Sequence, residues 1–598
     1  MKEEYSPVEV EEYTPTKEGY SAVEAVPYIP MKEEYNPDEA AEHKQEVAIT
    51  IGENNMTNDT PEKPEQNPVA PPTHTKPPPR QFVMILIALA LCVFIASLDQ
   101  IIVATSIPAI AREFDSLYDI SWLGTAYLMT LTSFQPLYGK VSDVFGRKAT
   151  LLFANFMFLV GSAIAGWAVS MNMLIVGRAV QGVGAGGLIA MVFIVLSDML
   201  DMRERGKYLG SVGAIYSVSS VIGPLLGGAF ADHVTWRWCF WINLPIGAIC
   251  MITIFFFLNL PTPPGSMKEK IKRIDFYGSF LLMLAVILIL LPLSWGGSRY
   301  AWKSGIIIGL LCAGFIVAGI FVLVEWKVPD EPIVPIHLFK FRNIWSTYGA
   351  LFFTGMSFFG ILFYLPVYFQ VVKGESATIG GLETIPFILG LTITSLGSGV
   401  WALKKGTYAF FPAMGNILFI AGSALCILFD VYTKRVVTVF VLMLCGLAVG
   451  FTTQSSTLAV QAAVKPKYMA TVTALVQFVR SLGQVFGVAI MGSVFNNKLE
   501  DSLVQEFPTD PTILRVILDY SSIYDYLPEQ RLVILKSFVH GLRYAFYCCV
   551  AFCVIAFVIS CFIQHKELKT EAEQAQDAEP DMAYTPVPAG ESKEQSLV

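Results

Sequence analysis

The 598-residue chain has few charged residues for its length. Charged residues make up 15% of it, whereas an average soluble domain has about 25%. Hydrophobic residues reach 54%, and the mean hydropathy is +0.55. This apolar excess excludes a water-soluble protein, so we expect an all-α, multi-pass membrane protein whose main surroundings are a lipid bilayer.

Several patterns that carry other functions are missing. The ten cysteines form no CxxC pair and have no histidines at ligand spacing, so we expect buried thiols and no metal. The sequence has no basic stripe that would indicate binding to nucleic acid. It also has no nucleophile–base pair and no phosphate-binding loop, which would indicate an enzyme, an ATP-driven pump or a bound cofactor. No signal peptide is recognisable, because about eighty polar residues precede the first apolar run.

Fourteen apolar segments follow, each near the length of about twenty residues that a bilayer requires. They lie near 82–108, 121–140, 149–169, 173–197, 208–231, 239–259, 275–295, 304–325, 346–370, 380–402, 409–429, 436–456, 468–495 and 541–563. The long charged segment 497–539 should be an outer loop with a short amphipathic helix near residues 513–520.

The distribution of Lys and Arg predicts the orientation of these segments. Basic residues gather in alternate short loops, at 140–148, 203–207, 268–273 and 404–405. Because cytosolic loops carry the excess of positive charge, this side should be cytosolic and both tails should join it. The tails, 1–81 and 566–598, are rich in Glu, Pro and Lys, and we expect them to be disordered.

The loop 139–148, GKVSDVFGRK, is the most informative short segment. Gly139 allows close approach of another helix, and Gly146 permits a tight turn. Asp143 and Arg147 stand four residues apart and can pair if the helix continues. Arg147 and Lys148 fix the loop at the cytosolic face.

Four further segments form an ordered set of motifs with that loop. They are LDQIIVA at 98–104, GRAVQG at 177–182, the run 213–228 that contains GPLLGG, and WRWCFWINLP at 236–245. Together with the loop, they resemble the ordered motifs of the major facilitator superfamily, in its fungal fourteen-span drug:proton antiporter branch. The resemblance covers about residues 82–565.

The resemblance implies a major facilitator fold of two pseudosymmetric six-helix bundles with two extra helices between them. The bundles would occupy 82–260 and 341–565, and the inserted helices with their linkers 261–340. Transport would then proceed by alternating access around a cavity near the membrane midplane. No cofactor is implied, since a proton gradient would drive the cycle.

Asp99 is the first candidate for the functional site. It lies about seventeen residues into the first segment, or roughly 25 Å along the helix. An unpaired carboxylate at that depth is costly, so Asp99 should face the bundle and either pair or hold a proton. A proton-coupling role, in which a cationic substrate competes with the proton, stands beside a purely structural ion pair.

Two arginines and two glutamines complete the candidate set for proton coupling or substrate contact. Arg178 lies in the fourth segment and either tunes a nearby acid or reaches toward the interface. Arg480 lies deeper, in the thirteenth segment, with Gln477 and Gln484 on the same helical face. Substrate contact and interhelical hydrogen bonding both remain open for that face.

The fifth segment carries a face of small residues. Gly213, Pro224 and Gly227 share this face, and Gly223 begins the GPLLGG run. Small residues let another helix approach closely, so this face is a seam on which the halves rock, an ordinary tight packing surface, or both at once, since the two roles are compatible.

The expected function is proton-coupled antiport of small organic molecules, including cationic ones, out of the cytosol in the manner of multidrug efflux. A vacuolar antiporter of basic amino acids fits the same logic, so the plasma membrane and the vacuolar or another internal membrane both remain open. A protein of another class, a non-transporting nutrient sensor, would fit the repeated MKEEY segments at 1–5 and 31–35. It would leave the charges inside the membrane unexplained. The oligomeric state is not predicted.

Overall fold

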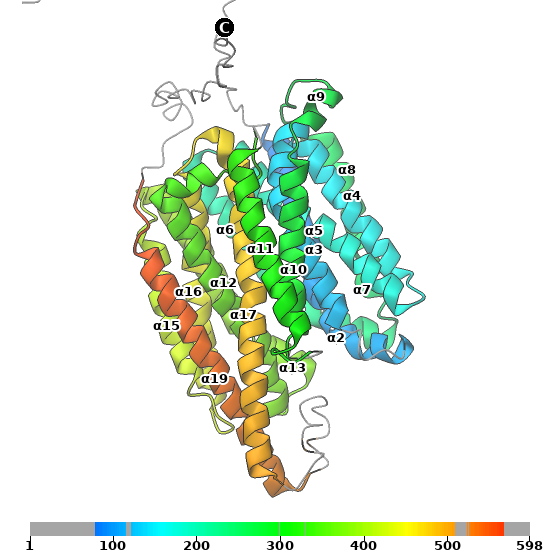
Figure 1. Ribbon diagram of the computed structural model, residues 1–598, viewed down its shortest axis with the longest axis vertical. Coiled ribbons are helices and arrows are strands. Elements are labelled where there is room, and N and C mark those ends of the chain that lie inside the picture. Colours follow the sequence, from blue (N-terminus) through cyan, green and yellow to red (C-terminus); the bar gives the residue numbers. More distant parts are fainter. Residues whose placement is uncertain are drawn as a thin grey trace, which may run out of the picture. The chain divides into compact units, whose positions relative to one another are not determined.

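The computed structural model describes residues 78–114, 121–297, 300–328, 331–508, 513, 523 and 526–566. The regular structure in these ranges is helical and contains no strand. Figure 1 shows the long helices lying side by side. The predicted disordered tails and the predicted amphipathic helix near 513–520 lie outside the described residues, apart from a few positions.

The first half of the chain forms six long helices. These are α2 (Pro79–Phe114), α3 (Ser121–Phe145), α4 (Arg147–Gly166), α5 (Met171–Met199), α6 (Met202–His233) and α8 (Asn243–Phe257), with the single turn α7 (Trp238–Trp241) before α8. Leu89, Phe158 and Leu188 belong to the hydrophobic core that they enclose. Close packing depends on small residues, since a Cβ on Gly177 of α5 would lie only 2.7 Å from the Ala165 backbone nitrogen of α4.

The second half forms six more long helices around a separate core that includes Phe387, Phe419 and Phe538. These helices are α12 (Arg342–Val367), α14 (Ile385–Lys405), α15 (Phe410–Cys426), α16 (Arg435–Gln461), α17 (Met469–Glu506) and α19 (Pro528–Ser560). The helix α12 continues into a π-helical turn at Tyr368–Val372, and the short α13 (Ala377–Leu382) precedes α14.

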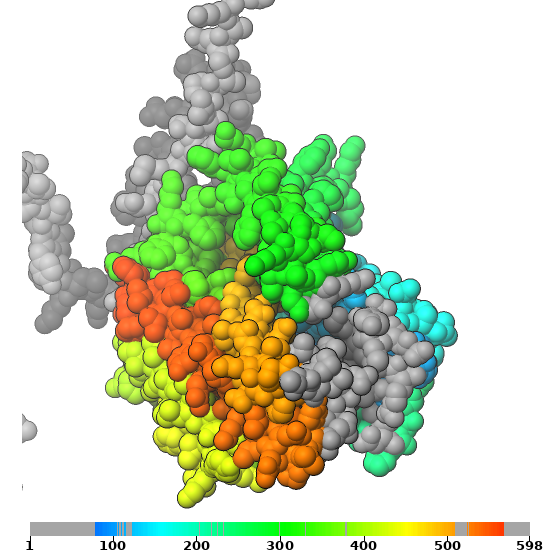
Figure 2. Space-filling model, turned by 60° about the horizontal axis from the view of Figure 1, so that its bottom comes forward, coloured from blue at the N-terminus to red at the C-terminus, as the bar shows by residue number. Residues whose placement is uncertain are grey.

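Two helices are inserted between the halves, as predicted. These are α10 (Phe276–Trp295) and α11 (Gly305–Lys327), preceded by the short α9 (Met267–Lys272). The helix α10 packs against α3 of the first half and α17 of the second. Figure 2 shows the green inserted pair beside the gold α17. Most of α11 is exposed, which suits a helix that faces lipid.

Each of the fourteen predicted segments coincides with one of these long helices. Twelve described helices are long and apolar enough to cross a membrane by length and composition. The other two are α15, which has 17 residues, and α3, whose composition is more polar and includes Pro136. The all-α fold with two six-helix halves and an inserted pair is therefore confirmed.

The boundaries of the predicted outer loop at 497–539 are wrong. The helix α17 continues to Glu506, and α19 begins at Pro528. The helices extend because their apolar stripes continue beyond the expected ends: Leu503 on α17 and Ile534 on α19 are both fully buried in the second core. Burial of these stripes favours continued helix over a charged loop.

Candidate functional site

Asp99 lies on α2, and its carboxylate is enclosed and paired with Arg178 of α5. The Arg178 Nη1 donates to Asp99 Oδ2 at 2.5 Å, and the two side chains are 2% and 0% exposed. Of the two states that the sequence leaves open for Asp99, the structure contains the paired one. Arg178 therefore faces the interior acid and does not reach toward the membrane surface.

Two amides complete the hydrogen bonding of the Asp99 carboxylate. Gln181 donates to Oδ1 at 2.6 Å, and Asn243 of α8 donates to the same oxygen at 2.9 Å. Gln181 also accepts a hydrogen bond from Arg178 and donates one to Ser162 of α4. Each carboxylate oxygen therefore has a donor, which is what a buried charge requires.

Arg178 has further contacts that do not depend on Asp99. Its Nε donates to the Leu123 carbonyl oxygen at 3.0 Å, and its guanidinium carbon lies 4.1 Å from the centroid of the Tyr127 ring. Gln181 and Asn243 are not among the predicted site residues, although they lie in the motif segments 177–182 and 236–245. Their polarity within apolar helices was the available signal.

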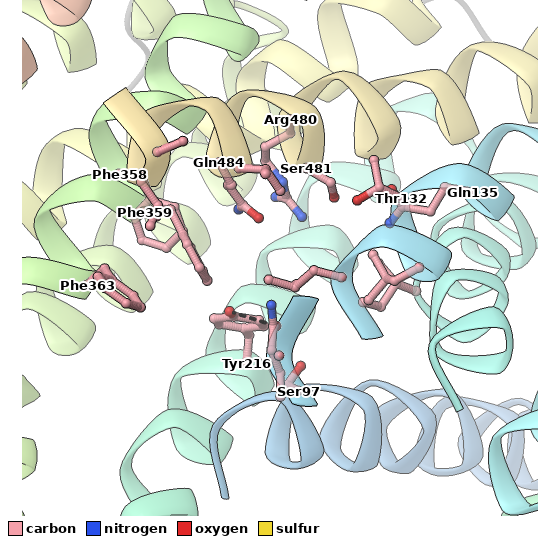
Figure 3. A pocket seen from close by; sticks show the side chains of 18 of the residues that line it. Ser97, Thr132, Gln135, Tyr216, Phe358, Phe359, Phe363, Arg480, Ser481 and Gln484 are labelled. Carbon is pink, nitrogen blue, oxygen red and sulfur yellow. Dashed lines mark hydrogen bonds between the residues drawn. The ribbon is translucent and has the colours of Figure 1, made fainter. Parts of the chain in front are cut away.

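A cavity of about 550 Å³ lies between the two halves, within the range of sites that bind small molecules. Figure 3 shows Arg480, Ser481 and Gln484 projecting into it from α17, opposite Tyr216 and Ser97. Three aromatic side chains of α12 form one side, and they are Phe358, Phe359 and Phe363. Thr132 and Gln135 of α3 lie on the other side.

The structure separates the predicted site residues into three groups. Arg480 and Gln484 line the cavity. Asp99 and Arg178 do not line it, although Ser97 and Gln100 on the same helix α2 do. Gln477 is fully buried away from the cavity, and neither atom of its amide has a partner among the described residues.

Tyr216 of α6 and Gln454 of α16 line the cavity although neither is among the predicted site residues. The Tyr216 hydroxyl donates to Gln100 Oε1 at 3.4 Å across the cavity wall, and Gln454 lines the cavity from the second half. No spacing rule marks either residue, because the cavity surface is assembled from residues of nine helices that lie far apart in the sequence.

The two halves are in close contact at the end of the molecule that carries loop 139–148, which we call the closed end. A Cβ on Gly139 of α3 would lie 2.9 Å from the Ala474 Cβ of α17. A Cβ on Gly206 of α6 would lie 2.9 Å from the Gly399 carbonyl oxygen of α14. The cavity instead extends toward the opposite end, where Gly124 and Asn496 belong to its wall.

The loop 139–148 forms the charge cluster that its spacing predicts. Arg147 Nη1 bonds Asp143 Oδ1 at 2.6 Å, and Arg147 Nε bonds Asp198 Oδ2 of α5 at 2.5 Å. Gly146 has φ 93°, a conformation that favours glycine, at the turn between α3 and α4. The Lys148 Nζ donates a hydrogen bond to Asn259 Oδ1 at 3.3 Å. The loop therefore ties three helices together at the closed end.

The small face of α6 serves two partners. Gly213 approaches Ser395 of α14, since an added Cβ would lie 2.9 Å from the Ser395 hydroxyl oxygen. Gly223 instead approaches Ile101 of α2, and the Gly227 carbonyl accepts a hydrogen bond from Ser106 of that helix. The side chain of Pro224 lies outside the described residues. One end of this face thus meets the other half, and the other end packs within its own half.

The linker after α11 is tied to loop 139–148 by one carboxylate. Glu331 bonds Lys140 Nζ at 2.6 Å and Arg273 Nε at 2.9 Å. Burial raises the pKa of Glu331, but the hydrogen bonds from Arg273 and Lys140 outweigh burial and hold that pKa below its ordinary value.

Replacement Glu331→Gln should therefore reduce the free energy of unfolding of the purified protein near pH 7 by about 1 kcal/mol or less. The thermal unfolding midpoint should fall accordingly. Because the folded-state pKa is depressed, this contribution is present above the ordinary glutamate value of about 4.3 and is lost as the pH falls below it. Melting curves of both proteins at several pH values check this. A difference that is unchanged at the lowest pH would contradict it.

Comparisons with known proteins agree with this architecture. The family model described as "Major Facilitator Superfamily" matches residues 89–488. The chain is 34% identical to the aspyridones efflux protein of Neocamarosporium betae over 88% of this chain and 93% of that one. It is 35% identical to the efflux pump aflT of Aspergillus parasiticus, over 70% of this chain and 82% of that one.

Solved structures share the fold. The human organic anion transporter MFSD10 aligns with a TM-score of 0.54 at 14% identity, over 82% of this chain and all of that one. The proton:xylose symporter XylE aligns with a TM-score of 0.51 at 13% identity, over 83% of this chain and 98% of that one. At such identities the likeness concerns the fold alone.

The family match, the fungal relatives and the helical architecture together establish that this chain is a transporter of the major facilitator superfamily, in its fungal efflux branch, and not an enzyme.

Proposed function

We propose that the protein exports small organic molecules from the cytosol in exchange for protons. The observation that carries this proposal is the buried Asp99–Arg178 pair, which lies behind the wall of the cavity formed by Ser97 and Gln100. A charge pair inside membrane helices is costly, and a role in proton coupling gives a reason for it. Its relatives named as efflux proteins support the direction of transport.

The mechanism would use Asp99 as the proton carrier. A proton that reaches Asp99 neutralises the carboxylate and removes the Coulombic attraction to Arg178, while the contacts of Arg178 with Leu123 and Tyr127 remain. The neutral Asp99 weakens the link between α2 and α5, and we propose that this change biases the halves toward the other open state. Release of the proton on the cytosolic side restores the pair and completes the cycle.

The orientation and the membrane are also proposals. Lys140, Arg147 and Lys148 lie at the closed end of the bundle, and the excess of basic loops supports a cytosolic position for that end and for both tails. The cavity would then open away from the cytosol. The plasma membrane and the vacuolar membrane suit this orientation equally, because export into an acidic vacuole uses the same direction of transport.

A cationic substrate, whether a drug-like cation or a basic amino acid, has less support. Asp99 was the acid expected to meet such a substrate, but its carboxylate is enclosed by Arg178, Gln181 and Asn243. Among the described residues that line the cavity there is no Asp or Glu. No specific observation favours a nutrient sensor without transport. The cavity between the two halves, which meet closely at one end, suits transport.

Reconstitution of the full chain into proteoliposomes with an imposed pH gradient tests the proposal. The probes are ethidium, lysine and naphthalenesulfonate, which represent a cation, a basic amino acid and an organic anion. We expect at least one probe to accumulate against its own gradient only while the pH gradient lasts. Gradient-independent movement of all three, or no movement of any, would contradict the proposal.

A further inference from the structure

Arg480 is the one charged residue among the described residues that line the cavity. It projects from α17 toward Tyr216 and the centre of the space in Figure 3. The rest of the wall is neutral, with apolar and aromatic side chains interleaved with hydroxyls and amides. The cavity therefore carries a net positive charge close to the middle of the membrane segment.

This arginine differs from the two other enclosed arginines described above. Arg178 is neutralised by Asp99, and Arg147 by Asp143 and Asp198. Arg480 forms no ion pair with any described acid, and its enclosed Nε atom has no hydrogen-bond partner in the described part of the protein. A partly buried guanidinium without a counter-charge is costly, so an anion that enters the cavity would be stabilised there.

Further polar atoms on the wall also lack partners. Ser97, Thr132, Gln135 and Gln454 are each 2% exposed or less, line the cavity, and have a side-chain oxygen with no partner among the described residues. Hydroxyl groups can donate hydrogen bonds to an acid group, and amide oxygens can accept from a ligand N–H or O–H. These atoms are available to orient a ligand in addition to the charge of Arg480.

The opposite wall suits an apolar ring system. Phe358, Phe359 and Phe363 of α12 line one side of the cavity in Figure 3. Phe358 and Phe359 meet edge to face with ring centroids 6.1 Å apart. Such a surface accepts the face or edge of an aromatic ligand. The volume of about 550 Å³ is sufficient for a molecule of several fused rings.

We infer that the cavity binds organic anions that have a flat apolar body and one ionised acid group, with Arg480 as the counter-charge and the α12 phenylalanines against the body. This inference rests on the proposed export function and names its substrate class. It replaces the expectation of a cationic substrate. The guanidinium favours carboxylate and sulfonate groups, because its fork of N–H donors matches two acid oxygens.

Equilibrium binding to the purified full-length protein tests the inference without any proton gradient. Three naphthalene probes share one ring body and differ in charge: naphthalenesulfonate, naphthalenesulfonamide and trimethylnaphthylammonium. We expect the sulfonate to bind about 10- to 100-fold more tightly than the neutral sulfonamide, which is the range expected for one hydrogen-bonded charge pair. The ammonium probe should bind most weakly, because it meets an unpaired positive charge.

Variants of Arg480 assign the preference to this residue. Arg480→Gln should make the sulfonate and the sulfonamide bind with similar affinity, and Arg480→Lys should keep part of the preference. Lys498→Gln is the matched control, since Lys498 lies on the same helix but pairs with Asp501 at an exposed position. That control should bind like the unmodified protein. Retained sulfonamide binding shows that the Arg480→Gln cavity is intact.

Three outcomes would overturn the inference: equal binding of the sulfonate and the sulfonamide, no measurable sulfonate binding, or an anion preference that survives Arg480→Gln. The proposed function can fail separately. Sulfonate binding that depends on Arg480, together with no gradient-driven flux of any probe, would support the anion site and contradict proton-coupled export.

Discussion

Replacement Asp99→Asn should abolish transport that depends on the pH gradient and leave membrane insertion intact. An amide keeps the shape of the side chain but replaces one acceptor oxygen with an N–H donor, and it cannot take up and release a proton near neutral pH. The measurement is gradient-driven flux in proteoliposomes, with the amount of inserted protein determined in parallel. Asp501→Asn provides the matched control, because Asp501 is exposed at the end of α17 and should transport normally.

Loss of folding could imitate that result, because Asp99→Asn leaves Arg178 as an uncompensated buried charge at a cost of about 3–5 kcal/mol. The double variant Asp99→Asn with Arg178→Gln removes both charges and should recover thermal stability. It should still lack coupled transport. If the double variant or Asp99→Asn alone shows normal coupled transport, Asp99 has no part in the coupling.

Replacement Gly399→Ala should strongly impair transport through a steric effect at the closed end. An added methyl group on Gly399 of α14 would collide with the backbone of Gly206 on α6, where the two halves meet. Overpacking of this kind costs about 1–3 kcal/mol. If the methyl group collides only when this end is closed, the equilibrium shifts toward the open state by roughly tenfold for each 1.4 kcal/mol.

Gly397→Ala is the matched control, since Gly397 lies two residues away on the same helix and has open space around the added methyl group. It should transport normally. Labelling from the cytosolic side of a single cysteine at Ser398, which is buried beside Gly399 and does not line the cavity, measures in each background how often the closed end opens. Equal labelling and equal transport in the two alanine variants would show that this contact does not control the closed state.

The sequence motifs predicted the fold and the contacts of loop 139–148 at the closed end, because these depend on local spacing and segment length. Gly139, Gly146 and the Asp143–Arg147 pair act through local spacing and backbone conformation, which the sequence displays directly. The fourteen apolar segments act through length, which is equally visible. The two wrong boundaries, at the ends of the predicted loop 497–539, arose because an amphipathic extension of a membrane helix looks like a charged loop in hydropathy.

The candidate site was harder to predict because it depends on contacts between helices. The sequence singled out both Asp99 and Arg178, but their pairing joins residues 79 positions apart and follows from packing. Gln477 and Gln484 share one face with Arg480, and yet only Arg480 and Gln484 reach the cavity. Gln477 lies one turn beyond Ala474, where α17 is pressed against α3 at the closed end.

The central claim, exchange of a substrate for protons through Asp99, is tested most directly by recording both movements at once. Proteoliposomes would contain a trapped pH-sensitive dye, a clamped membrane potential and whichever of ethidium, lysine or naphthalenesulfonate the protein transports. A substrate gradient alone should then drive protons in the opposite direction in the unmodified protein and in Asp501→Asn, but not in Asp99→Asn. Substrate movement without proton movement, or equal proton movement in Asp99→Asn, would contradict the claim.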